Sequence, residues 1–234
     1  MKIAEGKIYL SASDLSTHIA CPHATYLNLQ EARGLKKPSG QTFAALQVLQ
    51  LKGEEFEENY LKQLKSQGKT IVDIDNSARK EALESTLNAM AAGADVIYQA
   101  RLELDKWNGL ADFLVKVENP GKRSKFGPWY YEVMDTKLSR ETKAGAILQI
   151  CMYSEILSHL QGCMPEHMYI NNPNGEHQFR VDDFMAFYRL MKNKLTEAIC
   201  TPSEGYPEPV AHCDICKWWE DCNKQRRKDD HLSF

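Results

Sequence analysis

The sequence lacks the features that mark a membrane or exported protein. No apolar run in the 234 residues approaches the ~20 that a membrane-spanning helix needs. Residues 1–15, MKIAEGKIYLSASDL, contain no apolar core of the kind that a secretion signal carries. Repeats and low-complexity segments are also missing. With 43% apolar and 26% charged residues the composition is that of a globular protein. We therefore expect a cytoplasmic protein that makes no contact with a membrane.

The chain also lacks an excess of positive charge. Its net charge is −3 and its pI is ≈ 6.2, whereas domains that bind nucleic acids often have a pI above ~9. An acidic active site can offset a basic face, so the overall charge excludes little. Two local basic groups remain, and we expect them to contact phosphates if the protein binds DNA: Lys122, Arg123 and Lys125 in one, and Lys217, Lys224, Arg226, Arg227 and Lys228 in the other.

The seven cysteines do not predict a disulfide framework, because their number is odd and no secretion signal accompanies them. Metal binding is favoured instead. Cys213, Cys216 and Cys222 form a C-x2-C-x5-C pattern, and Cys21 stands alone far upstream, before a proline. Four thiolates of this kind would hold either a [4Fe–4S] cluster or Zn²⁺, and the spacing does not choose between them. Such a site would tie the first helix to the tail.

Apolar periodicity and turn residues predict an α/β fold. We expect helices over 9–33 with a break near Cys21-Pro22, over 43–66, 77–93 and 142–160, and from Asp182-Asp183 to about Cys200. We expect strands over 71–74, 96–104, 109–117, 129–138, 167–170 and 177–181, with a turn at Lys106-Trp107-Asn108. This order predicts one domain, 1–234, with a mixed β-sheet flanked by helices. It comprises a helical part (1–93), a catalytic α/β core (94–200) and a polar tail (201–234) that would bind the metal or cluster together with Cys21.

The stretch 109–138 contains the candidate catalytic residues. Asp112 and Asp135 lie on successive predicted strands, and Lys137 follows Asp135 on the same face of its strand. Carboxylates bind Mg²⁺, and an ammonium group can orient water or offset charge on a phosphate. Two aspartates and a lysine are also common on surfaces. However, an aspartate late in an apolar strand is disfavoured by propensity, and such a local inconsistency often marks function.

Candidates flank this stretch on both sides. Glu57 lies in the acidic run 53–58 of the second helix and could face the strand ends, although such a run is by itself typical of a solvated helix face. Gln149 and Tyr153 are one helical turn apart on the same face of a later helix. Taken alone, Tyr153 is better explained as a core residue.

Six short motifs in a fixed order give the chain a resemblance to a known family. They are Cys21, Gly53 to Glu57, Gly109 to Asp112, Asp135 to Lys137, Gln149 to Tyr153, and Cys213 with Cys216 and Cys222. In this order they resemble the RecB-like nucleases of the PD-(D/E)XK superfamily that carry an iron–sulfur cluster. The same group includes the AddB nuclease domain and the CRISPR-associated adaptation exonucleases.

The resemblance implies a restriction-endonuclease-like sheet and a metal-dependent active site. Glu57, Asp112 and Asp135 would hold Mg²⁺ or Mn²⁺, and Lys137 would assist the hydrolytic water. The four cysteines would bind a structural [4Fe–4S] cluster. Many relatives have histidine where this chain has Glu57, and a third carboxylate favours these hard cations.

The resemblance also implies that Gln149 and Tyr153 contact the DNA strand. The expected function is hydrolysis of phosphodiester bonds by a DNA exonuclease acting on single-stranded DNA or DNA ends, in repair, recombination or CRISPR-type processing. Helicase-like or other DNA-processing domains or proteins are the expected partners. The alternative is a non-catalytic nucleic-acid-binding module that uses the nuclease fold as a scaffold. A third interpretation, an electron carrier, is disfavoured because cysteines split across the chain resemble a staple.

Overall fold

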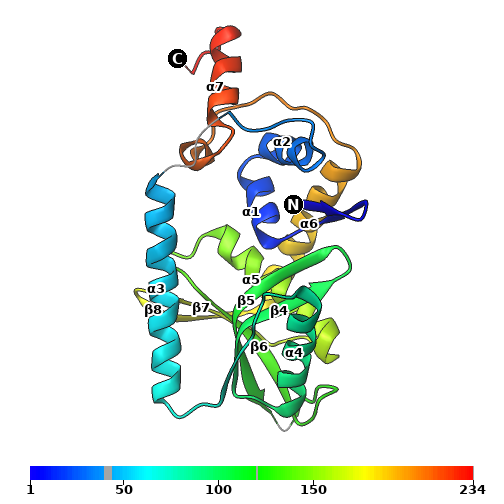
Figure 1. The fold of residues 1–234 in the computed structure, drawn as a ribbon, viewed down its shortest axis with the longest axis vertical. Coiled ribbons are helices and arrows are strands. Elements are labelled where there is room, and N and C mark those ends of the chain that lie inside the picture. The colour runs from blue at the N-terminus through cyan, green and yellow to red at the C-terminus, as the bar shows by residue number, and fades with distance from the viewer. Residues whose placement is uncertain (40–43, 120, 234) are drawn as a thin grey trace.

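The computed structural model describes residues 1–39, 44–119 and 121–233, and it is an α/β structure with a mixed six-stranded sheet flanked by helices (Figure 1). The strands of the sheet lie in chain order: β3 (Ile71–Asp73), β4 (Val96–Leu104), β5 (Trp107–Glu118), β6 (Trp129–Thr136), β7 (His167–Asn172) and β8 (Gly175–Arg180). A separate small hairpin comprises β1 (Lys2–Ala4) and β2 (Lys7–Tyr9).

The helices are α1 (Ala12–Ala20), α2 (Pro22–Ala32), α3 (Ala44–Ser66), α4 (Arg79–Ala92), α5 (Ala144–Gln161), α6 (Val181–Cys200) and α7 (Trp219–Lys228), with a short 3-10 helix, η1 (Ala211–Ile215). Two of them are crossovers. β3 and β4 are parallel and are joined through α4, and β6 and β7 are parallel and are joined through α5. The other neighbouring strands are antiparallel. None of the helices in the described part of the chain is long and apolar enough to cross a bilayer.

The two faces of the sheet pack against different helices. On one face Tyr60, Leu61 and Leu64 of α3 contact Phe113 and Met134. On the other face α4 and α5 join the main core, which also takes in residues of α1 and α6. Because α5 is surrounded, its buried residues lie on every side of the helix, as expected for a central helix. In Figure 1, α3 stands alone on its side of the sheet.

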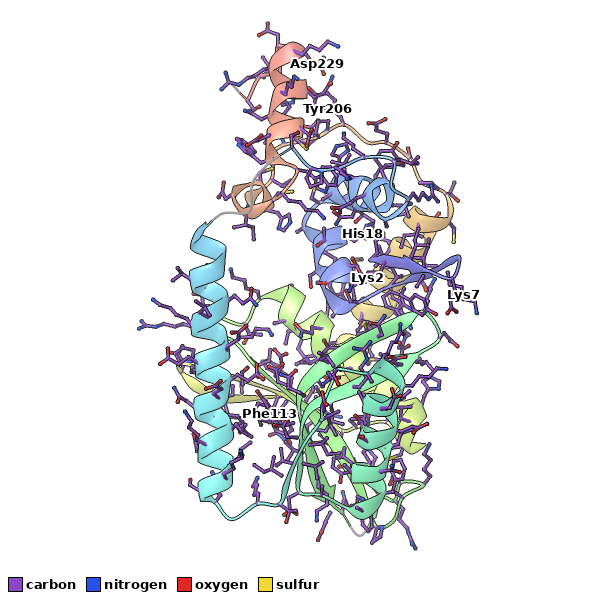
Figure 2. The ribbon with its side chains drawn as sticks, viewed as in Figure 1. Lys2, Lys7, His18, Phe113, Tyr206 and Asp229 are labelled. Carbon is purple, nitrogen blue, oxygen red and sulfur yellow. The ribbon has the colours of Figure 1, made fainter. Side chains whose placement is uncertain are left out.

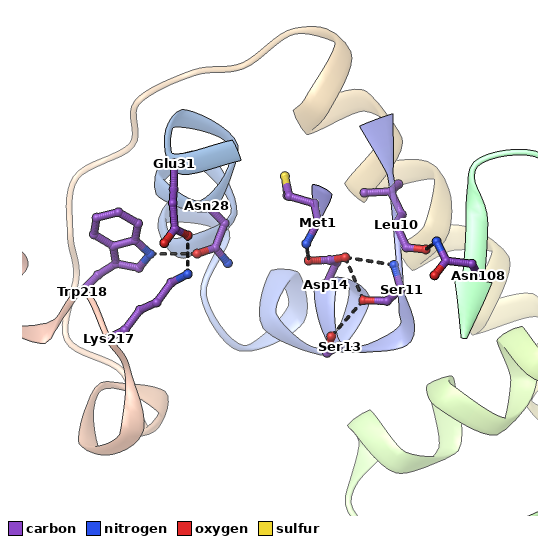
Figure 3. A network of polar contacts seen from close by, with 10 residues as sticks. All are labelled: Met1, Leu10, Ser11, Ser13, Asp14, Asn28, Glu31, Asn108, Lys217 and Trp218. Carbon is purple, nitrogen blue, oxygen red and sulfur yellow. Dashed lines mark hydrogen bonds and ion pairs between the residues drawn. The ribbon is translucent and has the colours of Figure 1, made fainter. Parts of the chain in front are cut away.

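The N-terminal segment is held in place by polar contacts (Figure 3). Ser11 is the N-cap of α1, and its backbone N–H donates to Oδ2 of Asp14 at 2.9 Å. The terminal amino group of Met1 forms a buried ion pair with Oδ1 of Asp14. The N–H of Asn108 donates to the carbonyl of Leu10 at 2.9 Å, which ties this segment to β5.

Several boundaries differ from the sequence prediction. The β4–β5 turn is Asp105-Lys106, not Lys106-Trp107-Asn108, because Trp107 is buried and pairs with Leu104 in the sheet. Asp105 takes the positive φ, 53°, that such a tight turn requires. The helix predicted over 43–66 is described over Ala44–Ser66, and Phe43 lies outside the described residues. Strand β6 ends at Thr136, so Lys137 lies just beyond it.

Candidate functional site

Asp112 and Asp135 face each other where strands β5 and β6 separate. The β5–β6 ladder ends at the pair Phe113–Met134, and one further step would put the two aspartates opposite each other. Asp112 is anchored across this gap. Its Oδ2 accepts hydrogen bonds from the N–H of Thr136 at 2.8 Å and from the Thr136 hydroxyl at 2.9 Å. The two carboxylates that sequence spacing predicts to meet therefore do lie together.

Asp135 is fully buried, with 0% of its surface exposed. Its Oδ1 accepts a hydrogen bond from Nε2 of Gln149 at 3.0 Å. Its Oδ2 forms an ion pair with Nζ of Lys137 but accepts no hydrogen bond of regular geometry. Burial, reinforced by the charges of Asp112 and Glu57 and opposed by Lys137, raises the pKa of Asp135 to about 7. The carboxyl group thus titrates near neutral pH.

Lys137 remains a cation in this setting. Burial alone would lower the pKa of its ammonium group, but the carboxylates of Asp135, Asp112 and Glu57 outweigh burial and raise that pKa. The backbone N–H of Lys137 donates to the carbonyl of Asn171 on β7 at 2.9 Å. This bond fixes the segment beyond the end of β6, so Lys137 returns toward the aspartates.

Glu57 reaches the same site from α3. Its Oε1 accepts a hydrogen bond from Nε2 of Gln99, and the hydroxyl of Tyr98 also donates to its carboxylate. Burial and the charge of Asp112 raise the pKa of Glu57, whereas these two donors and Lys137 oppose the rise. Glu54, Glu55 and Glu58 of the same acidic run are exposed. Of the four glutamates in this run, Glu57 is thus the one that is partly buried and points toward the sheet.

The carboxylate oxygens of Glu57, Asp112 and Asp135 are the kind of ligand that a hard cation prefers. The charge of Asp112 disfavours the ionised forms of Glu57 and Asp135, and a divalent cation would offset that repulsion. The buried Oδ2 of Asp135, without a regular hydrogen bond, is free to bind a cation in exchange for Lys137. Even so, no three His, Cys, Asp or Glu side chains in the described ranges are already placed as a group that could hold a metal ion.

Gln149 and Tyr153 lie on the side of α5 that faces the site. Nε2 of Gln149 is 3.4 Å from the Tyr153 hydroxyl, in addition to its bond with Asp135. Tyr153 is only 5% exposed and packs against Gly109, where an added Cβ would lie 2.4 Å from Cε1 of the ring. The glycine of the G-x-x-D motif thus has a packing role. As placed, Tyr153 is a core residue, and its contact with DNA stays a prediction.

Gln99 and Tyr98 are site residues that sequence reasoning missed. Both lie on β4, and both donate to Glu57. The sequence Tyr-Gln-Ala offers one indirect signal, a long polar side chain within an apolar strand. That signal does not indicate which way the side chain turns, because the backbone of Gln99 departs from a regular strand, with φ 52°.

The four predicted cysteine ligands line one cavity between α2 and the tail. Cys21, Cys213, Cys216 and Cys222 all belong to its lining, with His23 and Ala24 of α2 beside them. Trp218 is buried beside it with Ala24 and Leu27 of α2, and its indole N–H donates to Oδ1 of Asn28 at 2.8 Å (Figure 3). Segments nearly 200 residues apart thus meet at these thiols, as the sequence predicts.

Three of the four sulfur atoms each have one backbone N–H donor nearby. The N–H of Ala24 is 3.4 Å from Sγ of Cys21, and the N–H of Val210 is 3.4 Å from Sγ of Cys213. A backbone hydrogen bond from Trp218 acts on Cys216. Burial and the neighbouring cysteines raise the pKa of Cys222 to about 11. Soft, converging donors with N–H partners suit a thiolate-ligated metal or cluster, which would relieve the cost of ionising these thiols.

The two basic groups lie away from the carboxylates. Lys122, Arg123 and Lys125 belong to the loop before β6, at the opposite end of that strand from Asp135, roughly 20 Å away at the usual rise of a strand. The second group lies on and before α7, which projects beyond α2 at the far end of the molecule (Figure 2). Lys217 there pairs with Glu31, and Arg226 is buried. Neither group joins the carboxylate site.

Comparisons with known proteins leave the family open. No protein family matches the chain, and no curated protein matches it either. Among solved structures, the one described as "Crystal structure of SSO0001" is similar over 95% of this chain and 89% of that chain, with 13% identity and a TM-score of 0.38. A likeness of this size carries no argument about function.

Proposed function

We propose that the chain is a metal-dependent deoxyribonuclease with a restriction-endonuclease-like core, acting as an exonuclease on single-stranded DNA or DNA ends. The observation that supports this most is the meeting of Glu57, Asp112 and Asp135 with Lys137 at the point where β5 and β6 separate. Three carboxylates and one cation in a partly buried site, with Asp135 fully buried, are costly to maintain. They suit the hydrolysis of a phosphodiester bond.

Each residue of the site has its own role in the proposed hydrolysis. When bound, Mg²⁺ or Mn²⁺ would supply charge for the phosphate oxygens and acidify a water. Asp112, held by Thr136, and Asp135, held by Gln149, provide oxygen ligands in fixed orientations. Glu57 provides a third. Nζ of Lys137 pairs with Oδ2 of Asp135 in this structure. Once a cation takes that oxygen, the ammonium group would be released to orient the attacking water and to stabilise negative charge on the phosphate.

We extend the proposal to the cysteine cavity, which would hold a structural [4Fe–4S] cluster, with Zn²⁺ as the alternative. The cavity joins α2 to the tail and lies away from the carboxylates, which fits a structural role better than a catalytic one. Colour is the simplest test. An anaerobic preparation should be brown and contain iron and sulfide, whereas a colourless one with one zinc per chain would favour the alternative.

The active-site assignment is tested by Asp135→Ala and Lys137→Ala in the presence of Mg²⁺ or Mn²⁺. Both should lose cleavage of end-labelled single-stranded DNA by at least ~100-fold, because each removes a group that acts on the reacting phosphate. Lys116→Ala is a matched control, since Lys116 makes a similar ion pair with Asp95 at 2.9 Å on the surface. Undiminished cleavage by both site variants would rule out the assignment.

The rival function, a non-catalytic nucleic-acid-binding module, is separated from the proposal by the same preparation. It predicts that the wild-type chain binds DNA but cleaves neither linear nor circular substrates in any divalent metal. Comparing end-labelled with circular DNA also distinguishes exonuclease from endonuclease action. Binding by either function should weaken as salt rises, because phosphate contacts release counterions.

A further inference from the structure

Gln99 has an unusual backbone conformation for a residue within a strand. Its φ is 52°, in the left-handed region that residues other than glycine seldom adopt, and a long, non-Asn side chain has no local reason to adopt it. It lies in the middle of β4, between Tyr98 and Ala100, which both pair regularly with β5. Such outliers persist where the surroundings enforce them, and they cluster at functional sites.

The unusual conformation has a clear effect on where side chains point. In a regular strand, neighbouring side chains face opposite sides of the sheet. Here Tyr98 and Gln99 are consecutive, yet both donate to the carboxylate of Glu57 on α3. The turn in the backbone at Gln99 thus brings a second donor to the same acceptor, which a regular strand would not do.

A separate contact holds the backbone in this conformation. The side-chain Nδ2 of Asn76 donates to the carbonyl of Gln99 at 2.9 Å and to that of Ile74 at 3.0 Å. The N–H of Ile74 in turn donates to the carbonyl of Tyr98 at 3.1 Å. The carbonyl groups of Tyr98 and Gln99 are therefore both satisfied by residues that follow β3, and these bonds fix the distorted segment.

The distortion also interrupts the sheet at Asp112. The pairs Tyr98–Phe113 and Ala100–Ala111 belong to the β4–β5 ladder, but no Gln99–Asp112 pair lies between them. Asp112 is the aspartate that Thr136 anchors from the other side. Gln99 therefore lies next to two of the three carboxylates. Its side chain donates to Glu57, and its backbone lies opposite Asp112 at the step where the ladder is interrupted.

We propose that Gln99 is a positioning residue, whose strained backbone is maintained so that its carboxamide holds Glu57 in place as a metal ligand. The inference rests on the proposed function, because it needs Glu57 to bind the cation. A carboxamide suits this task for a physical reason. It donates a hydrogen bond to Oε1 without adding positive charge. It therefore orients the carboxylate without repelling a divalent cation, whereas a lysine in its place would repel that cation.

Gln99→Gly separates this role from a structural one. Glycine adopts φ 52° without a steric penalty, so the backbone can keep its shape while the carboxamide is lost. We expect the melting temperature of chelator-treated protein to stay within about 4 °C of wild type. We expect the affinity for Mn²⁺, measured by isothermal titration calorimetry, to fall by roughly 10- to 100-fold, the usual loss when a residue that orients a ligand is removed.

Two further variants sharpen the test. Gln99→Asn retains an amide and tolerates a left-handed φ, but its side chain is one methylene shorter, so it should also bind Mn²⁺ more weakly. Gln50→Ala is the matched control. Gln50 donates to Glu54 at 2.9 Å on the exposed part of α3, and its loss should leave Mn²⁺ affinity unchanged.

The outcomes distinguish the inference from the proposed function. If the wild type binds Mn²⁺ and cleaves DNA while Gln99→Gly and Gln99→Asn bind it equally well, the inference is wrong and the nuclease proposal stands. If Gln99→Gly unfolds well below the wild-type temperature, Gln99 is a structural residue and the inference is again wrong. A wild type that neither binds Mn²⁺ nor cleaves DNA overturns both.

Discussion

Asp135 dominates the electrostatics of the site at the scale of single residues. Its carboxyl group is fully buried, and its pKa is raised from 3.8 to about 7. Below the lower value the proton is bound in both the folded and the unfolded chain. Between the two values the folded chain retains a proton that the unfolded chain has lost. The contribution of Asp135 to stability therefore decreases as pH rises from about 4 to about 7.

Replacing this carboxyl group should change the pH dependence of stability. In chelator-treated protein, Asp135→Asn mimics the neutral form, so the difference in melting temperature between the variant and the wild type should grow in the variant's favour from pH 4 to pH 7. Thermal unfolding across that range measures it. A difference that does not change with pH would show that Asp135 titrates normally.

With saturating Mn²⁺ the wild type should gain more stability at pH 8 than at pH 6, because the ligand must be ionised.

Sequence could predict some of these residues and not others, for physical reasons. Asp112, Asp135 and Lys137 stood out because charged residues at strand ends in an apolar setting conflict with local propensity. Gln99 did not, because its role depends on a backbone φ that composition does not encode. Tyr153 is placed as a core residue, which is what its sequence context alone predicts, because its ring is buried against Gly109.

At the scale of elements, one of the two motif glycines, Gly109, sets how closely a helix approaches the sheet, and the other, Gly53, does not. Gly109 on β5 lies under the ring of Tyr153 from α5, whereas Gly53 on α3 has only Leu138 nearby, 4.0 Å from a would-be Cβ. Both belong to motifs that the sequence singled out. The structure gives them different roles, because only the first is in a contact too close for a side chain.

Alanine at these two positions should therefore have opposite effects. Gly109→Ala should lower the free energy of unfolding by about 1–3 kcal/mol, because the methyl group displaces Tyr153 and with it Gln149. Gly53→Ala should raise it by up to about 1 kcal/mol, since alanine favours a helix and finds room. Urea unfolding measures both. Equal destabilisation by the two variants would contradict the packing role of Gly109.

Elements with an apolar stripe were predictable, and elements without one were not. The long helices α3 and α6 and the central strands follow periodic apolar residues, whereas α5 is marked by an almost continuous apolar run. Helix α7 has no such stripe, and Arg226 is its buried residue. Its acidic residues in the first turn and basic residues in the last complement the helix dipole, which is the signal that would have found it. The β1–β2 hairpin is short and largely exposed, so its sequence carries little pattern.

At the scale of the whole molecule, the cysteine cavity connects the beginning of the chain to its end. Helices α2 and α7, whose residues line it, lie at one end of the structure in Figure 1, away from the sheet on which Asp112 and Asp135 lie. The hydrophobic cluster around it is small, with Ala24, Leu27 and Trp218 as its buried members. A cluster or metal there would add a constraint that this packing alone provides weakly.

Loss of one thiol should therefore destabilise the tail and release the metal. In Cys21→Ser we expect a lower iron or zinc content and a melting temperature lower by several degrees, because a ligand that bridges distant segments is removed. Cys200→Ser is the control, since Cys200 is exposed at the end of α6 and does not line the cavity. An unchanged metal content and melting temperature in Cys21→Ser would show that the cavity is no metal site.

The central claim is that these residues form a metal-dependent nuclease, and one titration tests it most directly. Chelator-treated wild-type protein is mixed with end-labelled single-stranded DNA, and the rate of cleavage is followed as Mn²⁺ is added, at pH 8, with Asp135→Asn in parallel. We expect no cleavage without metal, a saturable rise in rate with Mn²⁺, and no rise in the variant. DNA that is bound but stays intact at every concentration of Mn²⁺ or Mg²⁺ would contradict the claim.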